Sequence, residues 1–379
     1  MDASSVGEVE LSSVTADAIR MAETAGLVYV SPGEKGYTRI RNGDKFVYRD
    51  ADNRLVRNPM ELQRFAKLAI PPAYEDVWIC ADPRGHLQAT GRDARGRKQY
   101  RYHPDWRMTR DDAKFDRMIA FGDALPRLRR RLRRDLALTG LPREKVLAVI
   151  VSLLDVTRVR IGNESYVRDN KSYGLTTLRN RHAAFIRDGR VRFSFRGKGG
   201  ADHEVVVDDR RLARIVRRCQ QLPGQMLFQY VDDAGARRAI TSELVNAYLQ
   251  AITGAEFTAK DFRTWGATVR AFTLMAKTQL PEPPSERALK SCIVAAIKQV
   301  AAELRNTPAV CRKSYINPAV FDGWRSGALH RSVDAELSGA PRRAEAAALA
   351  YLRSRGGRQT PVRRAMREAA MQDAQRIAA

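Results

Sequence analysis

The prevailing period of the hydrophobic pattern changes close to Trp106, and this change constrains the fold more than any other feature. From residue 27 to residue 102 the apolar residues occur in short alternating runs, separated by turn formers such as Asn42-Gly43. A period of two is typical of strands that bury one face. Beyond Trp106 the apolar residues recur every three or four positions, which is typical of amphipathic helices. We therefore predict two domains of different class within the 379 residues.

Residues 21–108 are predicted to form a small antiparallel β-rich domain. One helix interrupts its strands from Pro59 to Leu68, and Pro71-Pro72 cannot continue that helix. Residues 1–20 are small and polar and are expected to form a flexible arm. The expected strand segments are Tyr37–Arg41, Lys45–Tyr48, Val77–Cys80, His86–Thr90 and Gln99–Tyr102.

Residues 109–355 are predicted to form a mainly α-helical domain, followed by a basic tail over residues 356–379. Within this domain, Ala183 to Val207 has the alternation of a three-stranded antiparallel meander, with hairpin turns at Asp188-Gly189 and Arg196–Gly200. The chain is therefore assigned to the α+β class. The expected helical segments include residues 111–121, 125–138, 144–154, 262–276 and 286–306.

The charge of the chain indicates a polyanionic partner. Lys and Arg number 67 against 43 Asp and Glu, so the formal net charge is +24, while the hydrophobic fraction of 44% is that of a folded protein. Nucleic acid is the expected partner, because its phosphates attract such a surface. Anionic membranes are the alternative partner, but the sequence has no apolar run near 18 residues. We therefore expect no membrane binding.

The four cysteines, at positions 80, 219, 292 and 311, do not indicate a metal site. They are far apart, form no Cys-x-x-Cys motif and lack a nearby pair of histidines. Buried free thiols in a reducing compartment are the expected state. The N-terminus is acidic and lacks the charged-then-apolar pattern of a signal peptide, so we expect a cytoplasmic protein.

Basic and aromatic residues interleave between Gly91 and His103 in the β-rich domain. Such a segment can place guanidinium groups on phosphates while a tyrosine meets a sugar or a base edge. The alternative interpretation is a solvated basic hairpin with no ligand. The candidate DNA-binding residues are Arg92, Arg95, Arg97, Lys98, Gln99, Tyr100 and Tyr102.

Tyr315 is the candidate nucleophile of the helical domain. Thr307-Pro308 predicts a helix start, and the short helix that follows carries Tyr315 near its end, with Arg312 and Lys313 close by. A phenol with an ordinary pKa of about 10 attacks poorly at neutral pH unless a base or nearby cations assist it. The alternative is that Tyr315, one of 12 tyrosines, is a packing or surface residue.

Three basic residues upstream are candidates for that assistance. Arg160 follows the apolar helix 144–154, and Gly162 gives the backbone freedom beside it. Lys198 lies in a glycine-rich hairpin turn that is not a P-loop, because no Ser or Thr follows the lysine. Arg263 lies near the start of a helix capped by Thr258, where the helix dipole favours an anion. Taken singly, Arg160 is better explained as a surface or Glu-paired arginine, and Gly-Lys198-Gly is a weak motif.

Taken together, these residues resemble the type IB DNA topoisomerases, in particular the short poxvirus-like and bacterial branch. The motifs in order are Arg160-Ile-Gly-Asn-Glu, Phe-Arg-Gly-Lys198, Lys-Asp-Phe-Arg263-Thr-Trp-Gly-Ala and Cys-Arg-Lys-Ser-Tyr315-Ile. The segments Leu87–Tyr100 and Gly174–His182 also look like this family. The resemblance covers residues 27–324.

The resemblance implies a monomer whose two domains form a clamp on duplex DNA, with a catalytic domain akin to that of tyrosine recombinases. It implies that Tyr315 forms a 3′-phosphotyrosyl link, that Arg160 and Arg263 bind the nonbridging oxygens, and that Lys198 acts on the leaving oxygen. It implies no cofactor: neither ATP nor an essential metal. Asn306 stands where the poxvirus pattern has a histidine; an amide can donate a hydrogen bond to a phosphate oxygen but carries no proton for acid–base work.

Two alternative functions are left open by the residues. The first is a tyrosine site-specific recombinase, against which the β-rich domain ending in Gln99-Tyr100 argues. The second is a non-catalytic basic DNA-binding protein, against which the joint presence of the four motifs argues. We expect a bacterial, nucleoid-associated protein, and we expect truncation after about Tyr351 to spare the chemistry because the matched motifs end earlier.

Overall fold

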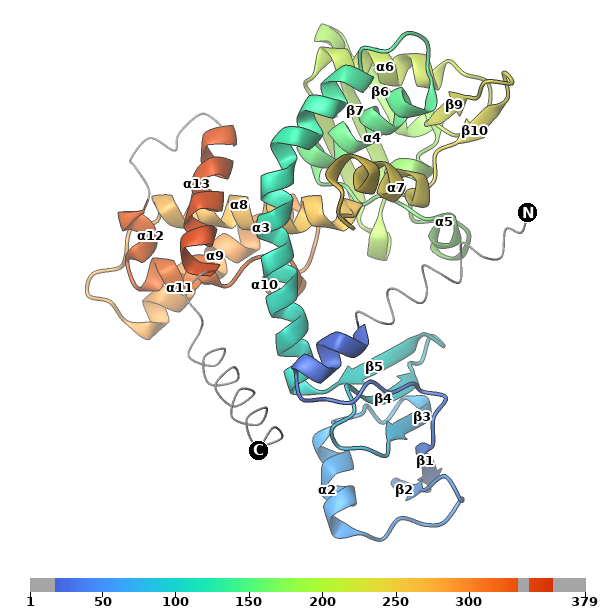
Figure 1. The fold of residues 1–379 in the computed structure, drawn as a ribbon, viewed down its shortest axis with the longest axis vertical. Coiled ribbons are helices and arrows are strands. Elements are labelled where there is room, and N and C mark those ends of the chain that lie inside the picture. Colours follow the sequence, from blue (N-terminus) through green and yellow to red (C-terminus); the bar gives the residue numbers. More distant parts are fainter. Residues whose placement is uncertain (1–17, 333–340, 357–379) are drawn as a thin grey trace, which may run out of the picture. The chain divides into compact units, whose positions relative to one another are not determined.

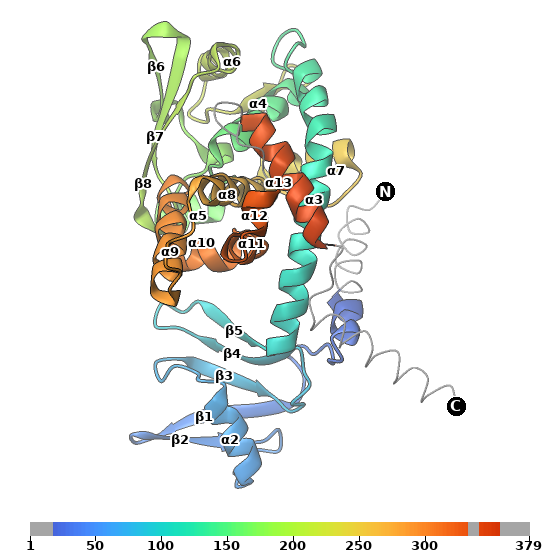
Figure 2. The ribbon, with the colours of Figure 1, turned by 90° about the vertical axis from the view of Figure 1, so that its left-hand side faces the viewer.

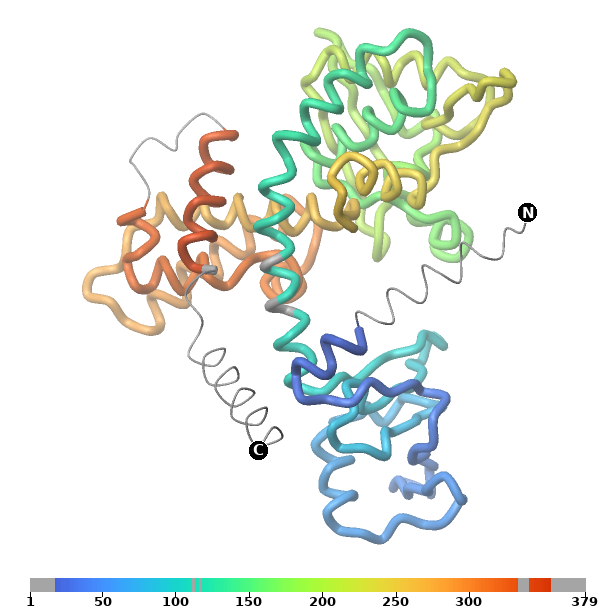
Figure 3. Tube along the Cα trace, viewed as in Figure 1, coloured from blue at the N-terminus to red at the C-terminus, as the bar shows by residue number. Residues whose placement is uncertain are grey.

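The structure is a computed structural model that describes residues 18–332 and 341–356. The chain divides into two compact units, residues 1–115 (unit 1) and residues 116–379 (unit 2). Figure 3 traces the chain, with the residues outside this description in grey. The predicted arm, apart from residues 18–20, and the predicted tail beyond residue 356 lie outside the described residues.

Unit 1 is built on a five-stranded antiparallel sheet with the order β2-β1-β3-β4-β5. Each of the five predicted strand segments forms one strand, so this part of the sequence prediction is confirmed. Alternation of apolar and polar residues accounts for the result, because one face of the sheet covers a small core of Val77, Ile79 and Ala89. The elements are β1 Gly36–Asn42, β2 Lys45–Arg49, α2 Pro59–Lys67, β3 Glu75–Cys80, β4 Leu87–Arg92 and β5 Lys98–Tyr102.

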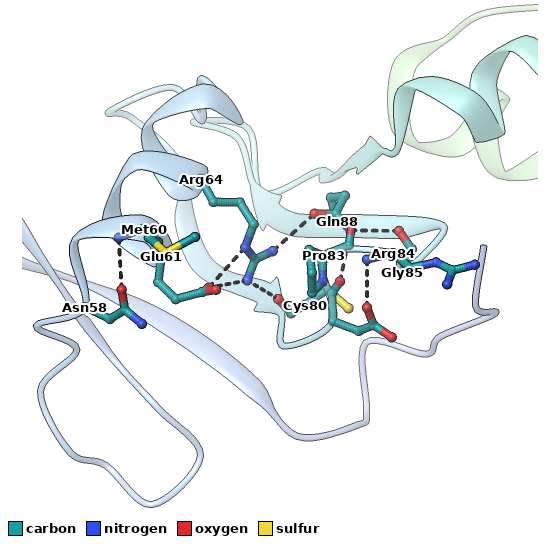
Figure 4. Close-up of polar contacts among 10 residues, drawn as sticks. Asn58, Met60, Glu61, Arg64, Cys80, Pro83, Arg84, Gly85 and Gln88 are labelled. Carbon is teal, nitrogen blue, oxygen red and sulfur yellow. Dashed lines mark hydrogen bonds and ion pairs between the residues drawn. The ribbon is translucent and has the colours of Figure 1, made fainter. Parts of the chain in front are cut away.

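Helix α2 is fastened to the sheet by one arginine (Figure 4). Arg64 forms an ion pair of 2.6 Å with Glu61 on the same helix. It also donates to Oε1 of Gln88 at 3.2 Å and to the carbonyl oxygen of Cys80 at 2.9 Å. Because Cys80 ends β3 and Gln88 lies in β4, this guanidinium links α2 to the neighbouring strands β3 and β4.

Helix α3, Pro104–Asp135, is one continuous helix, whereas the sequence indicated two separate segments. The two predicted segments left a gap at residues 122–124, which α3 spans, and Pro126 inside α3 removes one backbone donor without breaking the helix. Packing across the proline overrides this cost, since the buried stripe continues on both sides: Phe121, Leu125, Leu128 and Leu132. The predicted domain boundary after residue 108 falls inside this helix, and the contacts divide the chain after Phe115.

Unit 2 is mainly helical and contains the predicted three-stranded sheet, with the order β6-β7-β8. Figures 1 and 2 show helix α6 lying along this sheet. The strands are β6 Ala183–Ile186, β7 Arg190–Arg196 and β8 Asp202–Val207, and a small additional pair, β9 Gln229–Val231 and β10 Arg237–Ala239, was not predicted.

The remaining helices of unit 2 surround α8, whose residues from Phe262 to Val269 are all buried. Helices α4, α9, α11 and α13 pack against α8. The α-helices that follow α3 are α4 Arg143–Thr157, α5 Glu164–Asn170, α6 Arg210–Gln220, α7 Ser242–Thr253, α8 Ala259–Lys277, α9 Glu286–Glu303, α10 Pro308–Ser314, α11 Ala319–Arg325, α12 Ala328–Arg331 and α13 Pro341–Gly356. Over the described residues, no helix combines the length and the apolar character needed to cross a membrane.

Candidate active site

Tyr315 lies at the C-terminal end of α10, as the sequence predicted. Thr307 caps the start of this helix, with its hydroxyl accepting from the Val310 amide at 3.3 Å. The backbone N–H of Tyr315 closes the last turn on the carbonyl of Cys311 at 3.0 Å. Its own carbonyl accepts from the hydroxyl of Thr268 at 3.1 Å. Helix α8 therefore fixes the backbone that carries the phenol.

Arg263 of α8 is buried directly beside Tyr315, with 3% of the residue exposed. Its Cζ lies 5.2 Å from the centroid of the Tyr315 ring. One terminal nitrogen donates to the carbonyl of Leu304 at 2.9 Å and the other to the carbonyl of Arg158. Two backbone acceptors thus hold the guanidinium against the ring without neutralising its charge.

Arg160 and Asn306, which are 146 positions apart, are joined by a hydrogen bond from Nη2 of Arg160 to Oδ1 of Asn306. Three buried donors of this group find no hydrogen-bond partner within the described part of the chain: Nη1 of Arg160, Nδ2 of Asn306 and Nε of Arg263. Buried donors in native proteins are nearly always satisfied. Three donors without partners, two of them on guanidinium groups, are suited to an anion with several oxygens.

The cations of this group lower the pKa of the Tyr315 phenol below its ordinary value. Burial acts in the opposite direction, but the charge and hydrogen bonding of Arg263 and the charges of Arg160 and Lys260 outweigh it. Lys260 was missed from the sequence. It precedes Arg263 by three positions on α8. Because this spacing places two residues on one helix face, the sequence could have indicated that Lys260 lies near the site.

The other titratable side chains beside the site do not supply a competing nucleophile or acid. Burial raises the pKa of the Cys311 thiol to about 11, although Arg263 opposes this effect, so the thiol stays protonated at neutral pH. Burial and the charge of Arg160 lower the pKa of His203 to about 4. His203 is therefore uncharged at neutral pH and cannot act as an imidazolium acid in place of a histidine at position 306.

The family-like segment from Gly174 to His182 holds the Arg160 loop in place. The amide of Leu175 donates to the carbonyl of Arg160 at 3.0 Å. Gly162 has φ +102°, and a Cβ on Gly174 would lie 2.4 Å from the Gly162 nitrogen, so both positions need glycine. The amide of Tyr173 donates to the carbonyl of Arg196, the last residue of β7. This segment therefore connects the Arg160 loop to the base of the Lys198 turn.

Lys198 is exposed on the turn between β7 and β8. Gly199 and Gly200 have φ of +76° and +79°, and a Cβ on Gly197 would collide with the His203 ring at 2.4 Å, so three glycines shape the turn. In the described part of the molecule, no hydrogen bond links Lys198 to Arg160, Arg263, Asn306 or Tyr315. The structure thus brings four of the five predicted catalytic residues together, and within the described residues Lys198 makes no hydrogen bond to any of the four.

The seven predicted DNA-binding residues of unit 1 lie on β4, β5 and the turn between them. Arg92 pairs with Lys98 across the strands, and Thr90 pairs with Tyr100, so Arg92, Lys98 and Tyr100 share one face while Gln99 lies on the other. The rings of Tyr100 and Tyr102 stack with centroids 6.1 Å apart. Basic and aromatic side chains are therefore combined on a single face, as expected for a surface that contacts nucleic acid.

Three of these seven residues already have acidic partners. Asp93 forms an ion pair of 2.7 Å with Arg97 and accepts from Nε2 of Gln99 at 3.0 Å. Arg92 lies 3.2 Å from Asp76. Arg95 and Lys98 are exposed. The turn is thus held together by Asp93, whose pKa the hydrogen bond from Arg97 lowers to about 2.

Within the described residues, no group of three or more His, Cys, Asp or Glu side chains is arranged to hold a metal ion.

Comparison with known proteins agrees with this geometry. A family model for the catalytic core of eukaryotic DNA topoisomerase I matches residues 103–322, which is more than half of the chain. A second model, for the N-terminal domain of bacterial DNA topoisomerase IB, matches residues 45–93. The first match contains the whole group of five candidate catalytic residues, and the second contains the start of the basic turn.

Curated relatives give the same result. The DNA topoisomerase 1B of Acanthamoeba polyphaga mimivirus is 33% identical over 287 residues, which cover 74% of this chain and 85% of the viral protein. The DNA topoisomerase I of Monkeypox virus and the DNA topoisomerase 1B of Vaccinia virus (strain Copenhagen) are each 25% identical over 254 residues, covering 66% of this chain and 75% of theirs. With its motifs in order, four of its predicted site residues assembled and these matches along its length, the chain belongs to the type IB DNA topoisomerases.

Proposed function

We propose that the protein relaxes supercoiled duplex DNA through a transient single-strand break in which Tyr315 is joined to a 3′-phosphate. The observation that carries the proposal is a set of three buried donors on Arg160, Arg263 and Asn306 that have no partner among the described residues, next to a tyrosine whose pKa is lowered. A phosphodiester offers two nonbridging oxygens that can accept from these donors. Neither ATP nor a metal ion is required in this scheme.

The proposed reaction is a transesterification. The Tyr315 phenol loses its proton to water, its oxygen bonds to phosphorus, and the bond from phosphorus to the 5′-oxygen breaks, with that oxygen leaving as the 5′-hydroxyl after it gains a proton. Cations placed where negative charge develops stabilise such a transition state. Arg160 and Arg263 are assigned to the nonbridging oxygens, and Nδ2 of Asn306 to one of the same oxygens. The reverse reaction, attack by the free 5′-hydroxyl on the phosphotyrosine, reseals the strand and restores Tyr315.

Lys198 is proposed to donate a proton to the departing 5′-oxygen. Its position supports this role indirectly: it is exposed on a turn with three flanking glycines, and the base of that turn is tied to the Arg160 loop through Tyr173. A side chain on such a turn can enter the site when the substrate is bound.

We further propose that the protein acts as a monomeric clamp on DNA in the bacterial cytoplasm, associated with the nucleoid. The resemblance to the family supports the clamp and the monomer. The net charge of +24 supports association with a long polyanion. The basic face of β4 and β5 is assigned to the duplex outside the cleavage site.

A plasmid relaxation assay tests the proposed function. Negatively and positively supercoiled plasmid is incubated with the protein in EDTA without ATP, and we expect a ladder of relaxed topoisomers from both. Tyr315→Phe removes only the attacking oxygen, so we expect it to abolish relaxation and covalent protein–DNA adducts while duplex binding persists. Recombinant products between specific sites would instead favour a recombinase, and binding without any change of topology would favour a non-catalytic protein. Adducts that persist in the Phe variant would show that another residue is the nucleophile.

A further inference from the structure

Helix α13 lies outside the segment matched by the catalytic-core model, which ends at residue 322, yet it packs into the catalytic helices. Four of its side chains are almost fully buried, at spacings that define one helix face. Figures 1 and 2 show α13 beside α8 and α3 of the same unit. The buried side chains are Ala344 at 6%, Ala348 at 0%, Tyr351 at 3% and Leu352 at 2% exposed.

Glu345 of α13 is bonded to two other helices. Its carboxylate accepts from Arg129 of α3 at 2.6 and 3.0 Å, and from the indole N–H of Trp265 of α8 at 3.2 Å. Arg129 is in turn held by Asp155 of α4 at 2.7 and 2.8 Å. Trp265 is two residues beyond Arg263, so a carboxylate on α13 fixes the helix segment that carries the catalytic arginine.

Tyr351 of α13 holds the segment that follows the nucleophile. Its hydroxyl donates to the carbonyl of Ala319 at 3.0 Å, at the first residue of α11 and four residues after Tyr315. Its ring packs on Phe272 of α8. A Cβ on Gly323 would lie 1.5 Å from the Tyr351 hydroxyl, so the glycine leaves space for it. The hydroxyl therefore occupies a defined site on α11.

We propose that Glu345 and Tyr351 are positioning residues for strand cleavage: Glu345 fixes α8 and with it Arg263, and Tyr351 fixes the start of α11 and with it Tyr315. The proposal rests on the proposed function of Tyr315 and Arg263. Neither positioning residue touches the site itself. Their effect is on the separation of a guanidinium and a phenol on two different elements. A larger separation misplaces the phenol, and about 1 Å at a reacting group can cost about 100-fold in rate. It also weakens the interaction by which Arg263 lowers the pKa of Tyr315, and this part of the loss is recovered once the phenol ionises at high pH.

The test compares two conservative variants with two matched controls. Glu345→Gln breaks an interior ion pair between α3 and α13, and Asp123→Asn breaks the exposed pair between Asp123 and Arg353 of the same two helices. Tyr351→Phe removes a bonded hydroxyl, and Tyr230→Phe removes the hydroxyl of a residue in β9, remote in sequence from every site residue. All four proteins are assayed below the temperature at which any of them begins to unfold.

The measured quantity is the single-turnover rate of covalent adduct formation on saturating duplex, from pH 7 to pH 10. We expect Glu345→Gln and Tyr351→Phe to be slowed by roughly 10-fold or more at pH 7, with unchanged duplex affinity, and both controls to match the parent protein. Arg263 lowers the pKa of Tyr315, whereas Arg160 and Lys260, which also act on this phenol, are left in place. Displacing Arg263 raises that pKa, so the rate deficit must shrink as the pH rises and the phenol ionises without help.

A deficit of the same factor at every pH would assign α13 a structural role only and would overturn the positioning proposal. Rates equal to those of the controls would also overturn it. Both results leave the proposed function intact. That proposal is contradicted only if the parent protein does not relax DNA or if the Tyr315→Phe variant still relaxes it.

Discussion

Asn306 is the residue at which this chain departs from the poxvirus pattern, and its contacts assign its two side-chain atoms different tasks. Oδ1 accepts from Arg160, whereas Nδ2 is buried without a partner in the described structure. An amide has one acceptor and two donor hydrogens, so it can orient Arg160 and bind a phosphate oxygen at once. A histidine in its place would bring a titratable proton, and the neutral His203 nearby does not supply one.

We predict that Asn306→Ala slows strand cleavage by about 10²–10³-fold, the usual cost of losing one donor to a transition-state oxygen. Asn306→Asp separates the two tasks, because it keeps an acceptor for Arg160 but loses the donor. We expect the Asp variant to be at least as slow as the Ala variant, since its charge also repels the phosphate. Single-turnover cleavage of a duplex with one marked strand measures both. A near-normal rate for Asn306→Asp would mean that the residue serves only to orient Arg160.

The placement of candidate residues on their elements followed in part from the sequence, but one relation between them did not. Thr307 and Pro308 define where α10 begins, and so place Tyr315 at its end. The bond between Arg160 and Asn306 joins residues 146 positions apart, and no local pattern encodes such a pairing. Lys260 was overlooked although the helical spacing to Arg263 indicated it.

At the scale of elements, the turn between β7 and β8 is the feature whose function is most open to test. It is well formed, with the amide of Gly197 donating to the carbonyl of Ala201 at 2.7 Å, yet it leaves Lys198 exposed. Two interpretations follow: Lys198 is the general acid for the leaving 5′-oxygen, or it only contacts a phosphate.

Replacing the bridging 5′-oxygen by sulfur separates the two interpretations, because a thiolate leaves readily without a proton. We predict that Lys198→Ala cleaves the ordinary substrate about 10²–10⁴-fold more slowly and cleaves the sulfur substrate almost as fast as the parent protein. Lys171→Ala, which removes another exposed lysine of unit 2, is the control for loss of charge and should be normal on both. Equal impairment of Lys198→Ala on the two substrates would require the acid assignment to be withdrawn.

The elements themselves followed closely from the sequence, except where packing overrides local preference. Alternating residues predicted all five strands of unit 1 and the meander of unit 2. The sequence indicated two helical segments separated by residues 122–124, but α3 is continuous there and through Pro126, because buried residues on both sides of the proline stabilise the helix. The β9–β10 pair consists of three-residue strands, and strands this short give almost no periodic signal.

At the scale of the whole molecule, the structure argues against the expectation that truncation after Tyr351 spares the chemistry. Leu352 is 2% exposed, so a chain that ends at Tyr351 loses a buried core residue together with the last turn of α13. The family motifs end earlier because they contain the residues of the site but not the helices that support those residues. A stop after Gly356 leaves α13 entire and is the appropriate truncation.

The last prediction concerns the charge of the molecule as a whole. With a net charge of +24 and basic side chains exposed on both units, binding to duplex is expected to release many counterions. We predict that the affinity of the Tyr315→Phe variant, which cannot cleave, falls by about 10³–10⁵-fold between 50 and 200 mM salt, the range for 6–10 phosphate contacts.

The slope of this salt dependence also tests which basic residues meet phosphate. Arg95 and Lys98 are exposed and form no ion pair with an acidic side chain of the described residues, whereas Arg92 and Arg97 are paired with Asp76 and Asp93. Adding Arg95→Ala and Lys98→Ala should reduce the slope of log affinity against log salt by about 1.8, since each phosphate contact contributes about 0.9. Fluorescence anisotropy with labelled duplex measures it. An unchanged slope would show that these two residues do not contact phosphate. If the affinity of the Tyr315→Phe variant did not change with salt, electrostatic binding of DNA would be contradicted.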